Sequence, residues 1–287
     1  MNQLVSAIIT THNRFALLPR AIESVLSQSY KNIECIVVDD ASTDDTQNYC
    51  SNRSDIVYVR IEKKDSMGGN YARNKGISVA KGDLLAFLDD DDYWVKDKIE
   101  KQIQLLGSRK DLMVFCGRKI EIVNGDSVDY VADLPHHKSK GDMRHRILYT
   151  FPTVTSCIMV NKEMVEKIGC FDENLRYWQE SEMLIRLAQI IQFEYVNEPL
   201  VVYRSDKNDT NRLSNKFYDW KKCVAYIRKK HNTLYNQLSF KESLLYRTHF
   251  YSDAANRARM CGMKFRYLMY FLMLIPLRIV RKIDSAL

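Results

Sequence analysis

The first third of the chain alternates short apolar runs with longer amphipathic segments. The apolar runs, at residues 4–10, 33–38, 56–61 and 84–88, are rich in Val and Ile, which is typical of buried strands. The segments between them, at residues 14–28, 43–51 and 70–80, have a helical pattern; the first has one apolar face formed by Leu17, Ala21, Ile22 and Val25. This order predicts an α/β fold with an open, mostly parallel sheet and right-handed crossovers.

The alternation continues less regularly and then changes character after Arg204. We expect strands at residues 112–116, 119–123, 156–160 and 193–203, the last broken by Pro199, and helices at 96–107, 162–168 and 180–190. Residues 214–231, 240–259 and 264–283 all have helical patterns. The pattern therefore predicts an α/β domain at 1–205 and a helical region at 206–287.

Composition places the chain among globular proteins with a full hydrophobic core. It has 287 residues, of which 46% are hydrophobic and 28% charged. Its seven cysteines include no Cys-x-x-Cys pair, which favours reduced thiols over a disulfide framework or a zinc site. No signal peptide precedes the first predicted strand. These features predict a cytoplasmic protein.

The net charge of +7 is unevenly distributed. Residues 1–203 carry 25 Lys and Arg against 30 Asp and Glu, whereas residues 204–287 carry 18 against 6. A basic C-terminal region predicts a polyanionic partner, either nucleic acid or an anionic membrane. No helix-turn-helix, zinc or single-strand-binding pattern is present, which disfavours nucleic acid.

An apolar run at residues 267–277 bears on the choice of partner. It is shorter than the roughly 20 residues that span a bilayer, contains Pro276, and has cationic residues on both sides. This pattern favours an interfacial helix on an anionic membrane surface. The alternative is a buried helix that packs on the catalytic domain or on a second subunit, so a homo-oligomer remains possible.

Polar residues follow three of the predicted strands. They are Thr10 to Asn13, the pair Asp39 and Asp40, and the four consecutive carboxylates Asp89 to Asp92. Ligands of parallel α/β sheets bind outside the carboxyl ends of the strands. Four adjacent carboxylates are costly without a neutralising cation, and they suit Mg²⁺ or Mn²⁺ bound together with a substrate diphosphate.

Five segments in the same order and spacing resemble family 2 glycosyltransferases: residues 5–14, 24–30, 36–44, 70–76 and 86–94. The last contains the family's Asp-x-Asp metal motif, and Ala41 stands where the family usually has Gly. The resemblance implies the GT-A fold for the catalytic domain at 1–205, with a Rossmann-like nucleotide-sugar-binding half (1–95) joined to an acceptor-binding half (96–205). It also implies transfer of a sugar from a nucleotide sugar to a hydroxyl, with inversion at the anomeric carbon.

The resemblance extends to residues 156–160, 168–173, 179–186 and 203–206, with departures. Aligned on Arg186, Glu180 stands where the family has its catalytic Asp, and Gln179 stands at the preceding Glu. A shifted alignment would place Ser181 at the base position and leave no base. Asp206 stands where the family has a His that ligates the metal.

The resemblance implies a role for each of these residues. Glu180 would be the general base, within about 2.6–3.2 Å of the acceptor hydroxyl. Asp91 would bind the metal, assisted by Asp89 and Asp206, and Trp178 and Glu182 would contact the acceptor. The residues expected to bind the nucleotide sugar are Thr10, Asn13, Asp39, Asp40, Arg73, Asp89 and Asp90. Asp39 or Asp40 would accept the imide N–H of the nucleobase.

The sequence thus predicts an inverting glycosyltransferase that depends on Mn²⁺ or Mg²⁺. We expect it to move a hexose from a UDP-sugar to a lipid-linked saccharide in bacterial surface-polysaccharide (O-antigen or capsule) assembly, on the inner face of the plasma membrane. The alternative is a catalytically weak subunit that binds a nucleotide sugar or polysaccharide beside an active partner. The departures at Gln179, Glu180 and Asp206 motivate this alternative.

Overall fold

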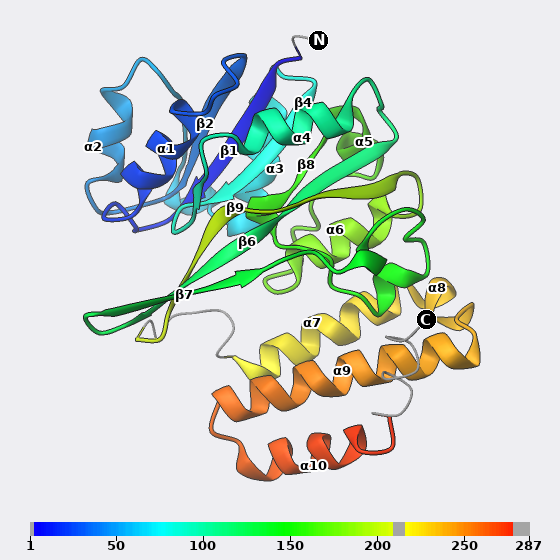
Figure 1. Ribbon diagram of the computed structural model, residues 1–287. Helices are drawn as coiled ribbons and strands as arrows, with labels where there is room; N and C mark the ends of the chain where they lie inside the picture. The colour runs from blue at the N-terminus through cyan, green and yellow to red at the C-terminus, as the bar shows by residue number, and fades with distance from the viewer. Residues whose placement is uncertain (1–2, 209–215, 278–287) are drawn as a thin grey trace. The chain divides into compact units, whose positions relative to one another are not determined.

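The computed structural model describes residues 3–208 and 216–277 (Figure 1). It divides into two compact units. Unit 1 comprises residues 1–142 and 152–208, and unit 2 comprises residues 143–151 and 209–287. The segment at residues 143–151, which the sequence analysis assigns to the acceptor-binding half, therefore groups with the C-terminal helices.

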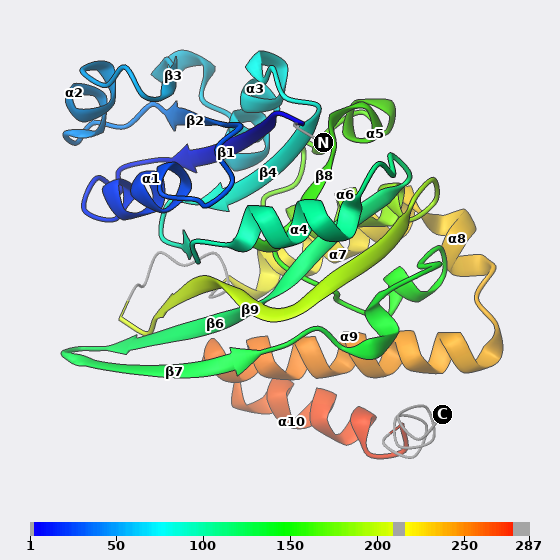
Figure 2. The ribbon, with the colours of Figure 1, turned by 45° about the horizontal axis from the view of Figure 1, so that its top comes forward.

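Unit 1 is built on one sheet with the strand order β3-β2-β1-β4-β8-β6-β9-β5, and β7 pairs with β6 (Figure 2). The strands are β1 (Val5–Thr11), β2 (Ile33–Asp40), β3 (Val57–Ile61), β4 (Leu84–Asp89), β5 (Tyr93–Trp94), β6 (Leu112–Asn124), β7 (Ser127–Asp133), β8 (Met159–Asn161) and β9 (Gln192–Asp206). The first four strands along the sheet are all parallel, as predicted. The remainder is mixed, because β8 runs antiparallel to both β4 and β6, while β6 and β9 are parallel.

Two predicted interruptions of the sheet were wrong. The segments predicted as separate strands at residues 112–116 and 119–123 form the single strand β6, and Pro199 lies inside the continuous strand β9. Both are explained by a register irregularity at Gly117, which pairs with Pro199. A proline has no N–H to donate, and a bulge is a position where the ladder lacks that bond.

Helices cover both faces of this sheet. Those of unit 1 are α1 (Leu18–Leu26), α2 (Thr46–Ser51), α3 (Gly69–Val79), α4 (Lys98–Leu106), α5 (Lys162–Lys167) and α6 (Gln179–Leu187), with short 3₁₀ turns η1 (Lys63–Asp65), η2 (His137–Ser139) and η4 (Thr155–Cys157). Helix α1 begins later than predicted because Pro19 occupies its first turn, where a proline is tolerated. Its apolar face packs with alternate residues of β1 and β4 in one core.

Helix α3 lies against the other face of β1. A Cβ atom at Gly76 would lie 2.5 Å from Cγ2 of Ile8, closer than any ordinary contact. Glycine is therefore required at this point for the helix to approach the strand. The close packing fixes the position of α3, which carries Arg73 to the carboxyl edge of the sheet.

Unit 2 is helical, with α7 (Phe217–Lys230), α8 (Asn232–Asn236), α9 (Phe240–Met260) and α10 (Lys264–Leu274), and a 3₁₀ turn η3 (Arg146–Leu148). Its aromatic core includes Phe217, Trp220, Phe250 and Tyr270. The predicted starts and ends of these helices at residues 214–215 and 278–283 lie outside the described residues. Within the described residues, no helix is long and apolar enough to cross a membrane.

Candidate active site

The polar strand ends predicted from the sequence meet at one edge of the sheet. Strand register places Thr10 of β1 between Val38 of β2 and Asp89 of β4. The three parallel strands therefore deliver their following loops to a common location. The structure brings together Thr10, the Asp39–Asp40 pair and the first carboxylate of the β4 turn, as the β-α-β pattern predicts.

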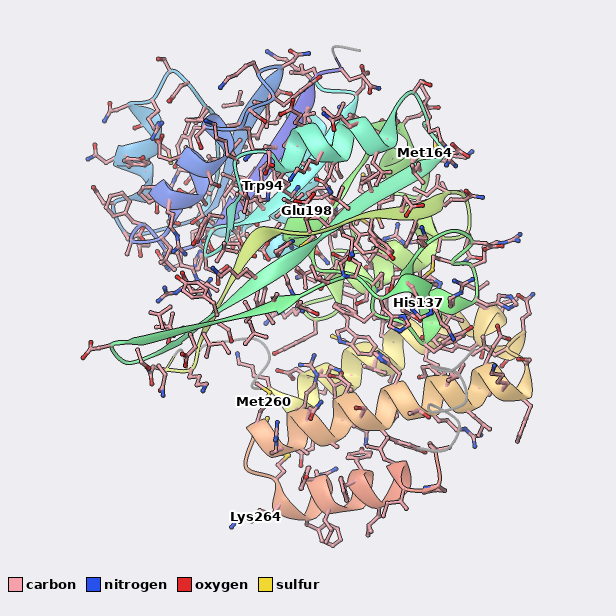
Figure 3. The ribbon with its side chains drawn as sticks, in the orientation of Figure 1. Trp94, His137, Met164, Glu198, Met260 and Lys264 are labelled. Carbon is pink, nitrogen blue, oxygen red and sulfur yellow. The ribbon has the colours of Figure 1, made fainter. Side chains whose placement is uncertain are left out.

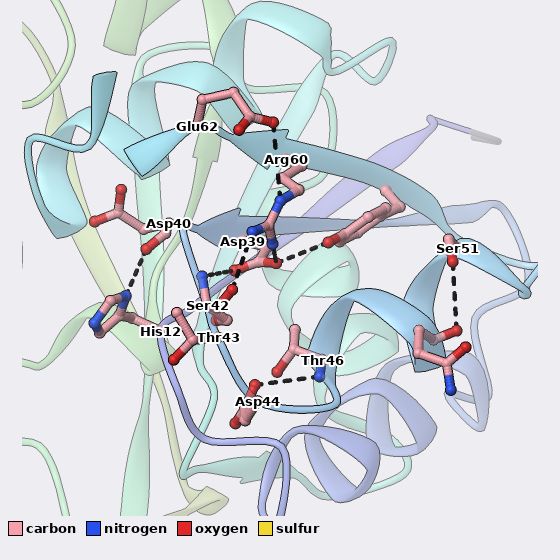
Figure 4. Close-up of polar contacts among 12 residues, drawn as sticks. His12, Asp39, Asp40, Ser42, Thr43, Asp44, Thr46, Ser51, Arg60 and Glu62 are labelled. Carbon is pink, nitrogen blue, oxygen red and sulfur yellow. Dashed lines mark hydrogen bonds and ion pairs between the residues drawn. The ribbon is translucent and has the colours of Figure 1, made fainter. Parts of the chain in front are cut away.

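Asp39, whose contacts are drawn in Figure 4, and Asn13 hold the loops of this edge in place. The Asp39 side chain is fully buried and accepts hydrogen bonds from the backbone N–H of Ser42 (2.8 Å), the hydroxyl of Tyr58 (2.7 Å) and the guanidinium of Arg60 (2.6 Å). Both carboxylate oxygens of Asp39 are thus engaged within the protein. Asn13 has a left-handed backbone (φ 54°) and its Oδ1 accepts from the backbone N–H of Thr43 (2.7 Å).

Asp40, the neighbour of Asp39, is available for a ligand. Its Oδ1 is buried and has no hydrogen-bond partner among the described residues. Its backbone carbonyl accepts from Nδ1 of His12, which fixes the turn in which the side chain lies (Figure 4). A buried acceptor without a donor is costly unless a ligand supplies the N–H. The structure therefore distinguishes the two aspartates, which the sequence could not.

The first carboxylate of the β4 turn faces helices α3 and α6. Oδ1 of Asp89 lies 2.6 Å from Nη2 of Arg73, and Nη1 of the same arginine donates to Oε1 of Gln179 at 2.7 Å. Arg73 is nearly buried, so its planar guanidinium holds these two groups in a fixed relation. The start of α6 is thereby bound to the end of β4, although the two are far apart in the chain.

The last carboxylate of the turn points inward. Asp92 is buried and accepts from the Ser156 hydroxyl (2.6 Å) and from the backbone N–H of Arg204 (3.0 Å). Burial raises its pKa well above the usual value, and the charges of Asp91 and Asp89 add to the effect. Asp92 is therefore a structural contact between the β4 turn and β9.

The two central carboxylates share an arginine that the sequence analysis does not assign. Nη1 of Arg14 lies 2.5 Å from Oδ2 of Asp91 and 3.3 Å from Oδ1 of Asp90. Burial and the neighbouring Asp91 raise the pKa of Asp90 to about 7, and burial raises that of Asp91 while Arg14 opposes the shift. The position of Arg14, directly after the polar end of β1, is the only sequence signal for this role.

A second arginine also reaches the β4 turn. Nη2 of Arg20 donates to the backbone carbonyl of Asp91 (3.0 Å), and Arg20 and Arg204 both contact the nearly buried carboxylate of Glu121. Asp206 does not join Asp91 in this arrangement. Its Oδ2 lies 3.0 Å from Arg204, and its Oδ1 accepts from the backbone N–H of Asn208 at 2.9 Å.

The oxygen donors at this edge fit a metal ion that binds together with a substrate. Among the described residues, no three His, Cys, Asp or Glu side chains are grouped to hold a metal. Mg²⁺ in proteins is usually held by one or two carboxylates, with water and substrate phosphates completing its octahedral shell. Asp89 and Asp91 can supply such carboxylates.

Glu180 lies in the first turn of α6, directly after Gln179. Its side chain is half-buried, and no other described residue hydrogen-bonds to its carboxylate. Burial raises the pKa of Glu180. Of the neighbouring charges, Arg73 lowers this pKa and Asp89 raises it. Glu180 is therefore beside the carboxylate turn of β4 and retains oxygens that can accept a proton.

The position of Glu182 does not support the predicted acceptor contact. Glu182 is completely buried, and its oxygens accept from Arg186 one helical turn later, at 2.6 and 3.0 Å. This ion pair lies inside the protein and stabilises α6. The other predicted acceptor residue, Trp178, is half-buried and precedes α6 in a left-handed conformation (φ 54°).

Comparisons with known proteins agree with this architecture. Residues 6–169 match the profile of glycosyl transferase family 2. An uncharacterized glycosyltransferase of Rickettsia typhi is 32% identical over 236 residues, which cover 79% of this chain and 72% of the relative. The putative teichuronic acid biosynthesis glycosyltransferase TuaG of Bacillus subtilis is 31% identical over 234 residues, with coverage of 78% and 87%.

A shorter match is more similar in sequence. The UDP-Glc:alpha-D-GlcNAc-diphosphoundecaprenol beta-1,3-glucosyltransferase WfaP of Escherichia coli is 41% identical over 119 residues, which cover 42% of this chain and 47% of WfaP. Among solved structures, S. aureus TarS 1–349 in complex with UDP-GlcNAc superimposes with a TM-score of 0.60 at 15% identity, covering 99% of this chain and 91% of TarS. The similarity to TarS establishes a common GT-A fold.

Proposed function

Because the chain belongs to glycosyl transferase family 2 and is therefore a glycosyltransferase, we propose that it transfers a hexose from a UDP-sugar to a hydroxyl of a lipid-linked saccharide, with inversion. The observation that carries this proposal is the link from Asp89 through Arg73 to the start of α6, which sets Glu180 beside the carboxylate turn. The WfaP name specifies a UDP-sugar donor and a diphosphoundecaprenol acceptor, and the TuaG name specifies a surface polysaccharide.

We assign donor binding to the carboxyl edge of β1, β2 and β4. Asp40 accepts the imide N–H of uracil through its buried Oδ1. Thr10, Asp89 and Asp90 lie along the ribose and diphosphate. Asp39 and Asn13 act on the donor indirectly, because their hydrogen bonds hold the loops that form the pocket.

Asp91 and Asp89 would hold a divalent ion, Mn²⁺ or Mg²⁺. When bound, this ion would supply Lewis-acid stabilisation of the departing diphosphate. Arg73 contributes a fixed positive charge at Asp89. Asp206 is a further candidate ligand, and it would have to exchange its contacts with Arg204 and the backbone N–H of Asn208 for the ion.

Glu180 is the general base of the proposed reaction. Its carboxylate accepts the proton of the acceptor hydroxyl while that oxygen attacks the anomeric carbon from the side opposite the diphosphate. The C–O bond to the diphosphate breaks as the new glycosidic bond forms, so the configuration inverts. A carboxylate with a raised pKa is a better proton acceptor near neutral pH. Trp178, two residues before Glu180 in the chain, supplies an aromatic surface for the acceptor sugar.

We further propose that the enzyme works on the inner face of the bacterial plasma membrane, where a lipid-linked acceptor would lie. The basic unit 2 supports this setting: within residues 143–151 and 216–277 it has fourteen Lys and Arg against three Asp and Glu, a net charge of +11. Anionic lipids attract clusters of this kind.

Replacement of Glu180 tests the catalytic assignment. We expect Glu180→Gln to lower kcat by about 10²–10⁴-fold without changing the affinity for UDP, measured by calorimetry. The protonated form of the base is inactive at low pH and its pKa is raised. The acid limb of the wild-type kcat/KM profile should therefore lie above the ordinary Glu value of about 4.3.

Glu163→Gln, at an exposed position in α5, is the matched control and should behave as the wild type. Wild-type turnover by Glu180→Gln would contradict the assignment of the base. Tight binding of UDP without turnover of any UDP-sugar, with Mn²⁺ present, would instead favour the alternative function as a nucleotide-sugar-binding subunit.

A further inference from the structure

Helix α10 has apolar residues on two opposite faces. Its inner face is directed at α9, where the buried ring of Tyr270 lies 6.4 Å from the ring of Phe250 and 6.1 Å from that of Tyr251 (centroid distances). Along the helix, Tyr267 and Phe271 contact each other, with ring centroids 5.9 Å apart. The contacts of Tyr270 stabilise the packing of α10 within unit 2.

The opposite face has a row of exposed apolar side chains, which we call the outer stripe. It consists of Phe265, Leu268, Leu272 and Ile275, with exposed fractions of 81%, 52%, 53% and 50%. Their spacing of three, four and three residues places them in one line along the helix. A contiguous row of exposed apolar side chains marks an interaction site, because its contact with water is unfavourable unless a partner covers it.

Positive charge accompanies the outer stripe. No acidic residue occurs in α10, and the exposed Lys264 begins the helix, beside the turn from Met260 (Figure 3). Arg266 instead reaches α7, where its guanidinium lies 3.2 Å from the hydroxyl of Tyr218 and over the ring of Phe217, so Lys264 is the cation of α10 next to the stripe. The described part of unit 2 as a whole has a net charge of +11.

A second copy of the chain is a poor partner for this surface. Stable subunit interfaces bury about 800 Å² on each side, whereas an 11-residue helix is only about 16 Å long and the stripe is one side chain wide. Pairing two outer stripes would also bring two strongly positive units together. An anionic bilayer suits this surface in two ways. Its acyl chains accept the apolar side chains of the outer stripe, and its charged headgroups attract the basic residues of unit 2.

We propose that α10 lies in the plane of an anionic lipid surface, with the outer stripe inserted at the boundary of the acyl chains. The inference rests on the membrane setting proposed above and identifies the surface responsible for it. The inner face of α10 remains packed on α9 in the bound state. Insertion is shallow, because the outer stripe extends only one side chain from the helix.

Vesicle flotation of the full chain tests this inference. The variant Phe265→Gln/Leu272→Gln replaces two exposed side chains of the outer stripe, and the control Val128→Gln/Val131→Gln replaces two exposed apolar residues on β7. With phosphatidylcholine vesicles containing phosphatidylglycerol, we expect the first variant to bind at least tenfold more weakly than the wild type. The control variant should bind like the wild type.

A spectroscopic variant makes the depth of insertion measurable. Phe265→Trp should show a blue-shifted emission on binding and quenching by lipids brominated near the headgroup end of the acyl chain. Transfer to a water-soluble acceptor should be unchanged in every variant, which separates this inference from the proposed catalysis. Equal vesicle binding by the wild type and the Phe265→Gln/Leu272→Gln variant would contradict insertion of the outer stripe and leave the basic surface as the membrane contact. Absence of wild-type binding would overturn the membrane setting as well, and conversion of a dimer to a monomer by the variant would assign the stripe to a subunit interface.

Discussion

Aspartates with the same chemistry have different tasks at the carboxyl edge of the sheet. Asp39 and Asp92 are buried and fully hydrogen-bonded within the protein. Asp40 has a buried oxygen without a donor, and Asp91 is paired with a partly exposed arginine. The geometry of each side chain thus separates the residues that hold the loops at the carboxyl edge of the sheet from those that remain available to a donor.

Asp39 and Asp40 provide a matched pair of variants. Asp39→Asn removes the charge that pairs with Arg60 and should lower the free energy of unfolding by about 3 kcal/mol, since breaking a buried ion pair typically costs about 3–5 kcal/mol. Asp40→Asn should leave stability nearly unchanged and weaken UDP binding at least tenfold. Urea denaturation and calorimetry with UDP measure the two effects. A loss of stability in Asp40→Asn together with a loss of UDP binding in a stable Asp39→Asn would refute these assignments.

Arg14 gives a prediction about metal affinity. Its Nη1 contacts the Asp91 oxygen that a divalent ion would use, so the guanidinium competes with the ion for this oxygen. A bound diphosphate would give the guanidinium a different anionic partner and reduce the competition. Arg14→Met should therefore raise the affinity for Mn²⁺ in the absence of nucleotide by about tenfold, or roughly 1.4 kcal/mol. The gain should be smaller with UDP present. Electron paramagnetic resonance of free Mn²⁺ measures both affinities.

The matched control for this prediction is Arg109→Met, which removes an exposed arginine of unit 1 paired with Asp111. Equal affinities of Arg14→Met and Arg109→Met for Mn²⁺ would mean that Arg14 does not compete at Asp91.

At the scale of elements, predictability followed burial. The strands β1, β2 and β4 were predicted nearly to their ends because each is a mostly buried, apolar run. Strand β3 was predicted from its Val and Ile residues, although only Ile61 in it is buried. Strand β7 was not predicted, because all of its residues are exposed and it has no buried apolar face. Its extended conformation depends on the pairing with β6. The break expected at Pro199 failed because the proline pairs with Gly117 in an irregular part of the ladder, which one strand alone does not reveal.

For the candidate site, the location of the residues could be predicted, whereas the residues that they contact could not. Strand ends gave the location of Thr10, Asp40 and Asp89, because parallel strands bring their carboxyl ends to one edge. Partners could not be predicted in this way. Arg14 and Asp91 are 77 positions apart in the chain, and periodicity contains no information about such a pair. Glu182 was predicted to contact the acceptor, but it is buried and paired with Arg186 one helical turn later, a partner that the prediction did not take into account.

At the scale of the whole molecule, charge is segregated along the chain. Residues 1–203 have a net charge of −5 and residues 204–287 a net charge of +12. An anionic surface therefore attracts the helical region and repels the catalytic region on average. Attraction of this kind acts over the Debye length, whereas insertion of the outer stripe depends on contact with apolar chains.

The two contributions should separate with ionic strength. Raising the salt concentration from about 0.1 M to about 1 M shortens the Debye length from about 10 Å to about 3 Å and screens the charges of unit 2. Wild-type protein should then lose most of its binding to phosphatidylglycerol vesicles in flotation but retain a residual fraction held by Phe265, Leu268 and their neighbours in the outer stripe. The Phe265→Gln/Leu272→Gln variant should retain a much smaller fraction, because only Leu268 and Ile275 of the outer stripe remain once the charges are screened. A residual fraction equal in the two proteins would show that the apolar side chains of α10 do not enter the lipid, and complete release of the wild type would show that charge alone holds it there.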